Sequence, residues 1–402
     1  MTDLTLSDAL LRVEPSATLA VTQKARELRA EGRDVMALAA GEPDFPTPEH
    51  VAEAGIRAIR DGHTTYTPVD GIPALKEAIA EKFRRDNGLD YDPGTEVVAT
   101  PGGKYLVFAA MLATLNPGDE VVIPAPYWVS YPDMVRLAGG TPVIAQTQVA
   151  DGYVLRPEAL EAAITERTRW VILNSPSNPT GGVYGPEATA ALAGVLRRHP
   201  HVWVLTDDMY EHVIYDAAFA TIASVAPDLK ARTLTMNGAS KAYAMTGWRM
   251  GYGGGPKPLM DAIRKVGSQS TSNPCSVSQY ATVAALNGDH GFLAERNAAF
   301  RARRDRVHAA LNAAPGLSCF LPQGAFYLYP SCEGVMGKRA NGQVIESDID
   351  FCAALLEAES VAVVPGTAFG ASPAFRLSYA TDMATLAEAC ARITRFCEGL
   401  TD

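Results

Sequence analysis

The sequence lacks the features of membrane and secreted proteins. No apolar stretch among its 402 residues is long enough to span a bilayer. Its start, MTDLTLSDALLRVEP, has no basic segment followed by an apolar core and a small-residue cleavage site. We therefore expect a cytoplasmic protein with no membrane partner.

Cysteines are few, and their spacing is not that of a metal site or a disulfide framework. They form no CxxC pair and have no histidine nearby at ligand spacing, and no HExxH motif is present. In a long chain without a secretory signal, such cysteines are typical of reduced thiols. We expect no metal, and free thiols at Cys275, Cys319, Cys332, Cys352, Cys390 and Cys397.

Positive charge is also scarce. The chain has 35 Lys and Arg against 45 Asp and Glu, a formal net charge of −10. It lacks the basic surface that grips phosphate backbones, so we expect no nucleic-acid partner. Neither common nucleotide motif is complete, because Pro256 replaces the third glycine of GxGxxG and Tyr105 follows Lys104 where a P-loop needs Ser or Thr.

Between about residues 50 and 300, short apolar runs alternate with helical stretches. Each run ends in a polar or Gly-rich turn, which is typical of strands buried on both faces of a mostly parallel sheet. This pattern predicts an α/β fold with helices on both faces. The expected strands are 120–124, 169–174, 202–207 and 232–237, with helices at 73–86 and 103–115. Ligands bind outside the carboxyl ends of such strands, where Asn174, Asp207 and Asn237 stand.

The pattern changes after about residue 300. An Arg-rich helical segment precedes the hairpin-like GAFYLYP, a helix near 347–358, the strand VAVVP, then FRLSYA and a last helix. These elements predict a smaller α+β domain, against which an N-terminal helix at 16–31 packs. We expect a large domain at 47–295 and a small domain made of 1–46 and 296–402.

One segment is rich in turn residues and another in carboxylates. SPSNPTGG (175–182) reads as a turn when taken alone. In LTDDMYEH (205–212), Asp207 closes an apolar run, and a carboxylate buried there needs a cationic partner. For Asp208, Glu211 and His212 we expect a solvated acidic loop.

Two further segments offer an amine and an anion site. In NGASKAYAMTGWRMGY (237–252), Lys241 stands among uncharged residues, eight positions before Arg249. Such a setting favours a depressed pKa and a nucleophilic amine. In PGGKY (101–105), two glycines open an apolar helix, whose free backbone N–H groups suit a phosphate.

Taken together and in order, these segments resemble the class I aminotransferases of pyridoxal-phosphate (PLP) fold type I. The resemblance is greatest to the bacterial aspartate aminotransferases whose members often also transaminate prephenate. It extends from about Arg12 to the C-terminus and includes AAGEPDF, YTPVDGIP, PAPYWVSYPDMV, SQSTSNP, GAFY and FRLSYA. It implies a large domain with a mostly parallel central sheet, a smaller α+β domain, and pyridoxal 5′-phosphate as cofactor.

The resemblance also implies roles for the residues around the cofactor ring. Lys241 would hold the cofactor as a Schiff base and then move the proton as general base and acid. Asp207 would pair with the pyridine nitrogen, which supplies its cationic partner. Tyr210 and Asn178 would hydrogen-bond the ring hydroxyl oxygen, and Trp128 would stack on the ring.

Other residues are implied at the phosphate and the substrate. Arg249 and the backbone of Gly102 and Gly103 would bind the phosphate, with Tyr66 reaching in from the other subunit of a homodimer. Arg376 would clamp the substrate α-carboxylate as a bidentate fork, which a lysine cannot do. Gly41 would let its loop approach the same carboxylate.

The chain departs from the family at two places. Many members have a phosphate-binding serine three residues before the lysine, where this chain has Gly238, so Ser240 is the candidate replacement. Other aspartate aminotransferases read the distal carboxylate with an arginine of the neighbouring subunit, where this chain has the neutral SQSTSNP. In the branch it resembles, Lys104 takes that role with Thr18 and Arg12.

The expected function is transamination of aspartate with 2-oxoglutarate, giving oxaloacetate and glutamate, with conversion of prephenate to arogenate as a second activity. Its partners would be small amino acids and 2-oxo acids. Two alternatives remain open. One is a different PLP reaction on the same fold, such as that of a β-lyase or of an aminotransferase for aromatic or neutral amino acids. The other is a non-catalytic aminotransferase-like sensor domain. Lys104 argues against neutral substrates, and the presence of Lys241, Asp207 and Arg376 argues against a sensor.

Overall fold

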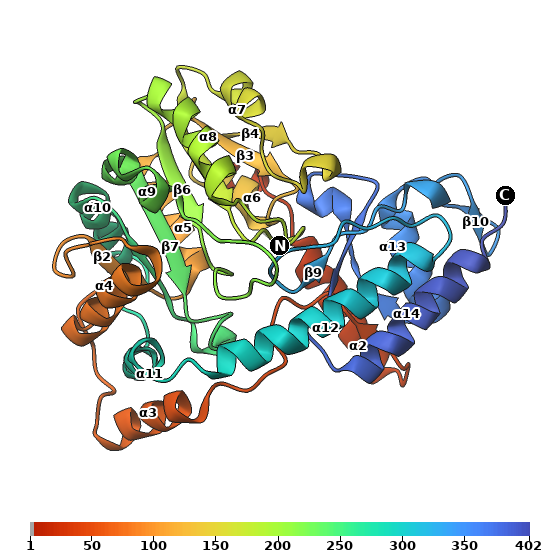
Figure 1. Ribbon diagram of the computed structural model, residues 1–402, viewed down its shortest axis with the longest axis horizontal. Helices are drawn as coiled ribbons and strands as arrows, with labels where there is room; N and C mark the ends of the chain where they lie inside the picture. The colour runs from red at the N-terminus through yellow and green to blue at the C-terminus, as the bar shows by residue number, and fades with distance from the viewer. Residues whose placement is uncertain (1–3) are drawn as a thin grey trace.

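The chain folds around a seven-stranded sheet. The computed structural model describes residues 4–402. The strand order is β2-β8-β7-β6-β5-β3-β4, on the left of the molecule in Figure 1. The strands are β2 (Val97–Thr100), β3 (Glu120–Ala125), β4 (Thr141–Gln146), β5 (Thr168–Asn174), β6 (Trp203–Asp207), β7 (Thr233–Gly238) and β8 (Gly251–Gly254).

The sheet is mostly parallel, as predicted. Strands β4, β3, β5, β6 and β7 all run parallel, whereas β8 is antiparallel to both of its neighbours, β7 and β2. The four strands expected from the sequence are β3, β5, β6 and β7, which lie side by side. Their carboxyl ends therefore meet at one edge, where a ligand site is expected.

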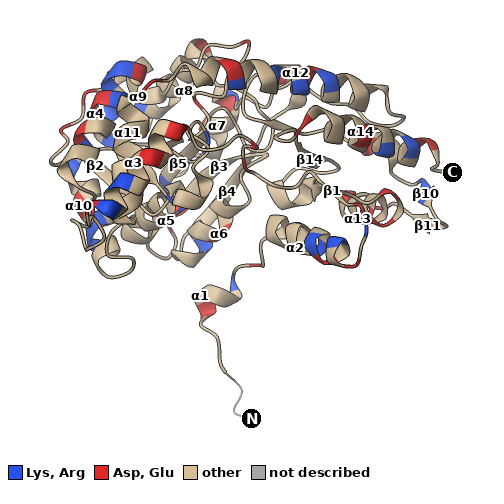
Figure 2. Cartoon of the chain, turned by 90° about the horizontal axis from the view of Figure 1, so that it is seen from below, with Lys and Arg blue, Asp and Glu red and all other residues tan. Residues whose placement is uncertain are grey.

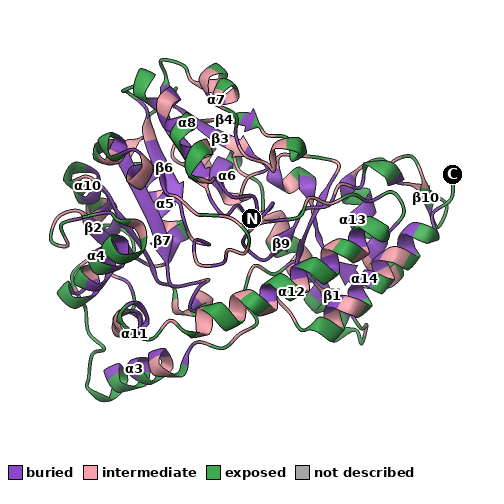
Figure 3. Cartoon of the chain, viewed as in Figure 1, coloured by how far each residue is buried: buried purple, intermediate pink, exposed green. Residues whose placement is uncertain are grey.

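Both faces of the sheet are covered, which explains the continuous apolar runs. In β6, Leu205 packs in a cluster with Leu106, and its neighbour Val204 packs in another cluster with Leu192. Figure 3 shows the central strands as buried and the outer helix surfaces as exposed. The surrounding helices are α3 (Glu49–Arg60), α4 (Pro73–Asn87), α5 (Gly103–Thr114), α6 (Ser130–Leu137), α7 (Pro157–Ala163), α8 (Pro186–Arg198), α9 (Ile222–Val225), α10 (Lys257–Ser268) and α11 (Ser276–Asn287).

The predicted helices at 73–86 and 103–115 are α4 and α5. Helix α4 has a proline in its first turn and is capped at its C-terminus by Gly88. Gly88 has a φ of 65°, a left-handed conformation that glycine adopts easily and that commonly ends helices. Helix α5 begins at Gly103, directly after β2 and the turn Pro101–Gly102. The start of α5 thus lies at the edge of the sheet where β5 and β6 end.

The remaining residues build a second core beside the sheet. A large apolar cluster joins α12 (Phe292–Ala313), which crosses the lower part of Figure 1, to α13 (Asp348–Glu359) and α14 (Met383–Glu398). The expected N-terminal helix is α2 (Ala17–Ala30), and it packs on this part through Ala25 and Leu28. Short strands complete it: β1 (Met36–Ala37), β9 (Tyr327–Leu328), β10 (Arg339–Ala340), β11 (Gln343–Val344), β12 (Val361–Ala362), β13 (Val364–Pro365) and β14 (Phe375–Ser378).

Two expectations for this part were wrong in detail. GAFYLYP does not form a hairpin with itself, because its strand β9 pairs with the distant β14. VAVVP is not one strand but two, since β12 pairs with β1 and β13 pairs with β14. The partners of these short strands lie far away in the sequence, so local patterning does not reveal them.

The first described residues form a segment that projects from the body. Figure 2 shows it carrying α1 (Asp8–Leu11), none of whose residues is buried. Across residues 4–402, no helix combines the length and apolar character needed to cross a membrane. The six cysteines are free, as the sequence predicted.

Candidate active site

A cavity of about 530 Å³ lies at the carboxyl edge of the sheet. Asn174 at the end of β5, Asp207 at the end of β6, and Arg376 of β14 line it together. Residues from both cores therefore meet here. The cavity is also lined by most of the other residues predicted for the site: Thr18, Gly41, Gly103, Lys104, Trp128, Asn178, Tyr210, Lys241 and Arg249.

Lys241 follows the end of β7 and points into the cavity. Its Nζ donates a hydrogen bond of 2.5 Å to the carbonyl oxygen of Gly41 and lies 5.8 Å from the ring centre of Tyr210. Loss of hydration among these neighbours lowers the pKa of the Lys241 amine to about 8. A neutral amine is thus available near physiological pH, as a nucleophile requires.

Asp207 is a buried carboxylate, only 5% exposed. Burial raises its pKa to about 6, although a 2.5 Å hydrogen bond from the Tyr131 hydroxyl to its Oδ2 acts in the opposite direction. Among residues 4–402, its Oδ1 receives only a 3.3 Å bond, from the backbone N–H of Met209. The carboxylate therefore keeps capacity to accept a strong hydrogen bond from a cationic N–H group in the cavity.

Tyr210 pairs with a tyrosine that sequence reasoning did not single out. The hydroxyl groups of Tyr210 and Tyr327 lie 2.8 Å apart, and Tyr327 also lies against the Arg376 guanidinium. A side-chain carbon added at Gly41 would come within 2.8 Å of the Tyr327 hydroxyl, so that position has no room for one. Tyr131 and Tyr327 belong to the segments PYWVSYP and GAFY, which contribute to the family resemblance. Their spacing in the sequence does not indicate that they contact Asp207 and Tyr210.

One end of the cavity suits a phosphate. Arg249 adopts φ of 55°, and its Nη1 donates to the carbonyl oxygen of Thr246 at 2.9 Å. Gly102 has φ of 88°, and a carbon added there would lie 2.4 Å from Arg249 Nη2. The guanidinium thus rests directly on the backbone that leads into α5, whose free N–H groups also attract anions.

The same end explains one departure from the family pattern. A side-chain carbon at Gly238 would lie 2.9 Å from the carbonyl oxygen of Met250 and 3.2 Å from the Gly251 Cα. A serine there would require the backbone to move. Ser240, in contrast, is buried and lines the cavity.

Arg376, another lining residue, is buried. Its Nη1 donates to Asn178 Oδ1 at 2.9 Å, and its Nη2 donates to the carbonyl oxygen of Ala39 at 2.6 Å. Its Nε is buried without a hydrogen-bond partner in residues 4–402. A buried guanidinium with an unused donor is suited to bind a carboxylate.

Lys104, Trp128 and Thr18 also line the cavity. Lys104 Nζ lies 5.0 Å from the ring centre of Trp128, and within the described chain it forms no ion pair. Thr18 Oγ1 is buried and, among residues 4–402, has no partner. A cation and a hydroxyl group are therefore free to receive an anionic group.

Three predicted residues stand outside the lining. Gly102 lies directly behind Arg249, as described above. Arg12, at the end of α1, is exposed and does not reach the cavity. Tyr66 is 89% exposed and is also absent from the lining, so this single chain brings neither side chain to the site.

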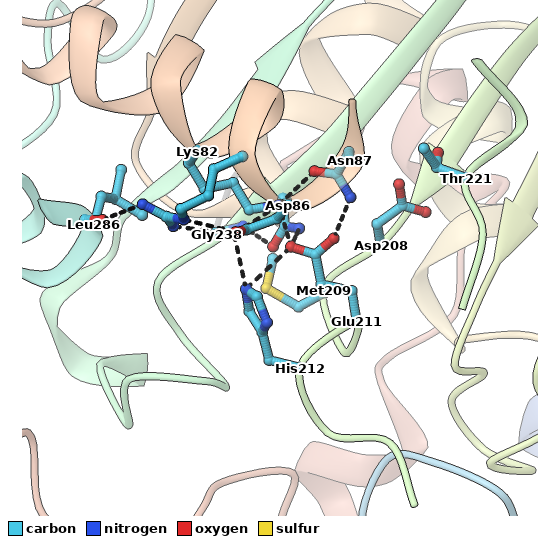
Figure 4. A network of polar contacts seen from close by, with 12 residues as sticks. Lys82, Asp86, Asn87, Asp208, Met209, Glu211, His212, Thr221, Gly238 and Leu286 are labelled. Carbon is cyan, nitrogen blue, oxygen red and sulfur yellow. Dashed lines mark hydrogen bonds and ion pairs between the residues drawn. The ribbon is translucent and has the colours of Figure 1, made fainter. Parts of the chain in front are cut away.

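The expectation of a solvated acidic loop after Asp207 was wrong. Asp208 and Glu211 are buried, and His212 is partly buried. Asn237 also differs from the prediction, since its Nδ2 donates to Glu211 at 2.8 Å instead of facing the cavity. Figure 4 shows Asp208, Glu211 and His212 together with Lys82, Asp86 and Asn87. A buried lysine from a distant helix, Lys82, compensates the charge of Glu211.

Comparison with known proteins agrees with this geometry. An aspartate/prephenate aminotransferase of Cereibacter sphaeroides is 59% identical over 397 residues, covering 98% of this chain and 99% of that one. The crystal structure of the Rhizobium meliloti aspartate aminotransferase superposes with a TM-score of 0.96 at 52% identity, covering 99% of this chain and all of the other. The Thermus thermophilus enzyme, solved with maleate, gives 0.92 at 45% identity, covering 98% and 100%.

The match to a family model extends over most of the chain. The model for aminotransferase class I and II covers residues 33–393, which include both the sheet and the second core. The fold predicted from the sequence is thereby confirmed at the level of the whole molecule. The chain belongs to the class I and II aminotransferases.

Proposed function

We propose that this chain transaminates aspartate with 2-oxoglutarate, giving oxaloacetate and glutamate, and that prephenate is a second amino acceptor. The observation that carries the proposal is the convergence of the Lys241 amine, the buried Asp207 carboxylate and the buried Arg376 guanidinium on one cavity. The names of the relatives, aspartate and aspartate/prephenate aminotransferases, support the choice of substrates.

Enzymes of this class use pyridoxal 5′-phosphate, the cofactor predicted from the sequence. The residues present fit that group. Asp207 keeps an acceptor for a protonated ring nitrogen, and Arg249 with the start of α5 offers an anion site. Lys241 supplies the amine that holds the cofactor covalently.

The bound cofactor supplies an electron sink for the pair left on the substrate Cα. Asp207 holds the proton on the ring nitrogen, which is favoured by a buried negative partner. Lys241 Nζ takes the Cα proton as general base and returns it as general acid, a role suited to its pKa of about 8. Tyr210 and Asn178 would orient the ring through their polar atoms, and Trp128 would cover its face.

Substrate binding rests on two cationic groups. Arg376, with its unused Nε, binds the α-carboxylate at a position fixed by Asn178 and Ala39. Lys104 and Thr18 receive the distal carboxylate. Since Lys104 is a point charge on a flexible stem, it tolerates acceptors at different positions. Maleate in the Thermus structure is likewise a dicarboxylate.

We also propose a homodimer in which the partner completes each site. The exposure of Tyr66, together with the exposed Leu10 and Leu11 of the projecting segment, supports this assembly. In the dimer, Tyr66 of each subunit contributes to the neighbouring phosphate site. Arg12 is proposed to join Lys104 and Thr18 at the distal carboxylate. We further propose a large domain at 47–295 and a small domain made of 1–46 and 296–402, of which residues 1–3 lie outside the described part. A cytoplasmic location is likewise proposed.

The test is a panel of amino donors with 2-oxoglutarate, with prephenate included as an acceptor for aspartate. Aspartate and glutamate should each convert the visible absorbance of the bound cofactor to that of its amine form, and alanine should do so poorly. Faster conversion by alanine or phenylalanine than by aspartate would refute the dicarboxylate assignment. No conversion by any amino acid would refute transamination.

A further inference from the structure

A buried charged network lies behind the cavity and is not part of its lining. It consists of Lys82 and Asn87 of α4, Glu211 in the loop after β6, and Asn237 of β7. The Lys82 side chain is 0% exposed, its Nζ contacts Glu211 Oε1, and it donates to Asn87 Oδ1 at 2.7 Å. Figure 4 shows Lys82, Asn87 and Glu211 of this network together with the neighbouring Asp86 and His212.

Glu211 is the centre of the network. Its Oε2 accepts from Asn87 Nδ2 at 2.7 Å and its Oε1 from Asn237 Nδ2 at 2.8 Å. Asn237 in turn accepts the backbone N–H of Gly238 at 2.7 Å. The Glu211 carboxylate thus connects helix α4, strand β7 and the loop after β6 through directional hydrogen bonds.

The network does not need a metal ion. Ligand atoms of Asp86, Glu211 and His212 lie within 4.8 Å of one another. However, Lys82 Nζ already contacts Glu211 and lies 4.0 Å from Asp86 Oδ2. The lysine therefore supplies the positive charge that a cation would bring.

The position of the network relates it to the active site. Glu211 directly follows Tyr210, and Asn237 precedes Lys241 by four residues. The network therefore fixes the two segments that carry the cavity residues Tyr210 and Lys241. A buried ion pair contributes little net stability compared with apolar residues of the same volume, but it does impose directional contacts.

We propose that Lys82 and Glu211 are positioning residues that fix Tyr210 relative to Lys241. This inference rests on the proposed function. Small displacements of the group that orients the cofactor relative to the group that moves the proton lower the rate strongly, so loosening the network lowers kcat. KM changes little, because Arg376 and Lys104 bind the substrate from other segments.

Two variants separate positioning from stability. Asn237→Ala cuts the link to β7 without leaving a buried charge unpaired. Lys82→Met/Glu211→Gln removes both charges and keeps an acceptor for the asparagines. The matched control is Arg304→Met/Asp216→Asn, which removes another ion pair (2.9 Å, with Arg304 2% exposed) that lies outside the lining of the cavity.

Each protein is compared by the free energy of unfolding without cofactor, the Kd for PLP, the pH midpoint of the visible absorbance of bound PLP, and the kinetics with aspartate. We expect both variants to shift the absorbance midpoint and to lower kcat by roughly 10- to 100-fold at nearly constant KM. The control should retain the wild-type midpoint and kcat even where its stability falls.

Wild-type midpoint and kcat in both variants would overturn the positioning role, as would equal changes in the control. If one variant does not fold, the other decides by the same readouts; if neither folds, the network serves stability and the inference is wrong. Inactive wild-type protein would instead refute the proposed function, so the two failures are distinguishable.

Discussion

At the scale of single residues, two ionisable side chains in the cavity have pKa shifts with one dominant cause. Burial raises the pKa of Asp207 to about 6 and lowers the pKa of Lys241 to about 8. Both shifts disfavour the charged form that the isolated side chain would carry at neutral pH. The cofactor-free site is therefore destabilised by the groups that we propose to hold the cofactor.

Asp207→Asn tests this cost. Since the folded-state pKa of Asp207 lies above its unfolded value of 3.8, the folded form binds the extra proton, and wild-type stability falls as pH rises from about 4 to 6. Without cofactor, the variant should gain up to about 3 kcal/mol over wild type across this range and keep that advantage above it. Denaturant unfolding at several pH values measures the difference.

A suitable control is Asp119→Asn, where the shift has the opposite sign. Hydrogen bonds from Asn116 and Arg169 outweigh burial and hold the pKa of Asp119 below its usual value. That carboxylate stabilises the fold above its unfolded pKa, so its replacement should lower stability at neutral pH. If Asp207→Asn without cofactor were less stable than wild type at pH 7, the buried Asp207 charge would not destabilise the fold as we infer.

Lys104→Ala tests whether Lys104 binds the distal carboxylate of the substrate. Removing the cation should raise KM for aspartate by about tenfold, equivalent to about 1.4 kcal/mol of binding, with little change for alanine. Lys257→Ala serves as control, because Lys257 is an exposed lysine paired with Asp261 on the surface of α10. Equal losses for aspartate and alanine would show that Lys104 does not distinguish them.

At the scale of elements, the junction of β2 and α5 combines backbone conformation with the anion site. Gly102 and Gly118 both have positive φ, 88° and 93°, but only Gly102 lies against Arg249. Gly102→Ala and Gly118→Ala should each lose about 1 kcal/mol of stability from strain. Only Gly102→Ala should also weaken PLP binding, because its added carbon displaces the guanidinium.

Thermal unfolding and PLP titration measure the two effects separately. Gly118→Ala carries the same cost of backbone strain but no side-chain clash, since a carbon at Gly118 meets no atom within 4 Å. Any difference in PLP affinity between the two variants therefore comes from the contact with Arg249. Equal PLP affinity in both variants would exclude contact between the Gly102–Arg249 unit and the phosphate.

The elements that sequence patterning predicted are those whose burial is local and periodic. The apolar runs that became β3, β5, β6 and β7 need only two covered faces, and their polar ends placed Asn174 and Asp207 at the site. Glu211 was misjudged because its charge is compensated by Lys82, more than a hundred positions away. Asp208 is also buried, and it accepts a hydrogen bond from the Thr206 hydroxyl. Charge alone in a sequence does not show whether a distant partner exists.

The resemblance to a known family contributed what patterning could not. Nothing local identifies Arg376, Gly41 or Asn178 as neighbours, yet all three line the cavity. Tyr131 and Tyr327 were missed because their role is a contact with another side chain, and such contacts appear only in the folded chain.

At the scale of the whole molecule, a hybrid dimer tests whether sites are shared. Tyr66→Ala alone should raise the Kd for PLP about tenfold through loss of one hydrogen bond to a charged group. Lys241→Ala alone should have no turnover. A mixed dimer of the two variants should regain one complete site, with wild-type PLP affinity.

Turnover at limiting PLP measures that recovery, and each variant alone provides its control. A mixture that keeps the weak affinity of Tyr66→Ala would show that Tyr66 acts within its own subunit or not at all. Monomeric protein at assay concentrations, with full activity, would contradict the shared site entirely.

The central claim is that the ε-amine of one lysine is covalently joined to the cofactor. Borohydride reduction of protein incubated with PLP, followed by peptide mass spectrometry, tests it most directly. We predict one reduced adduct per chain, located on Lys241, and a folded Lys241→Ala protein with neither adduct nor turnover. An adduct on another lysine, or none in protein that remains colourless, would contradict the account.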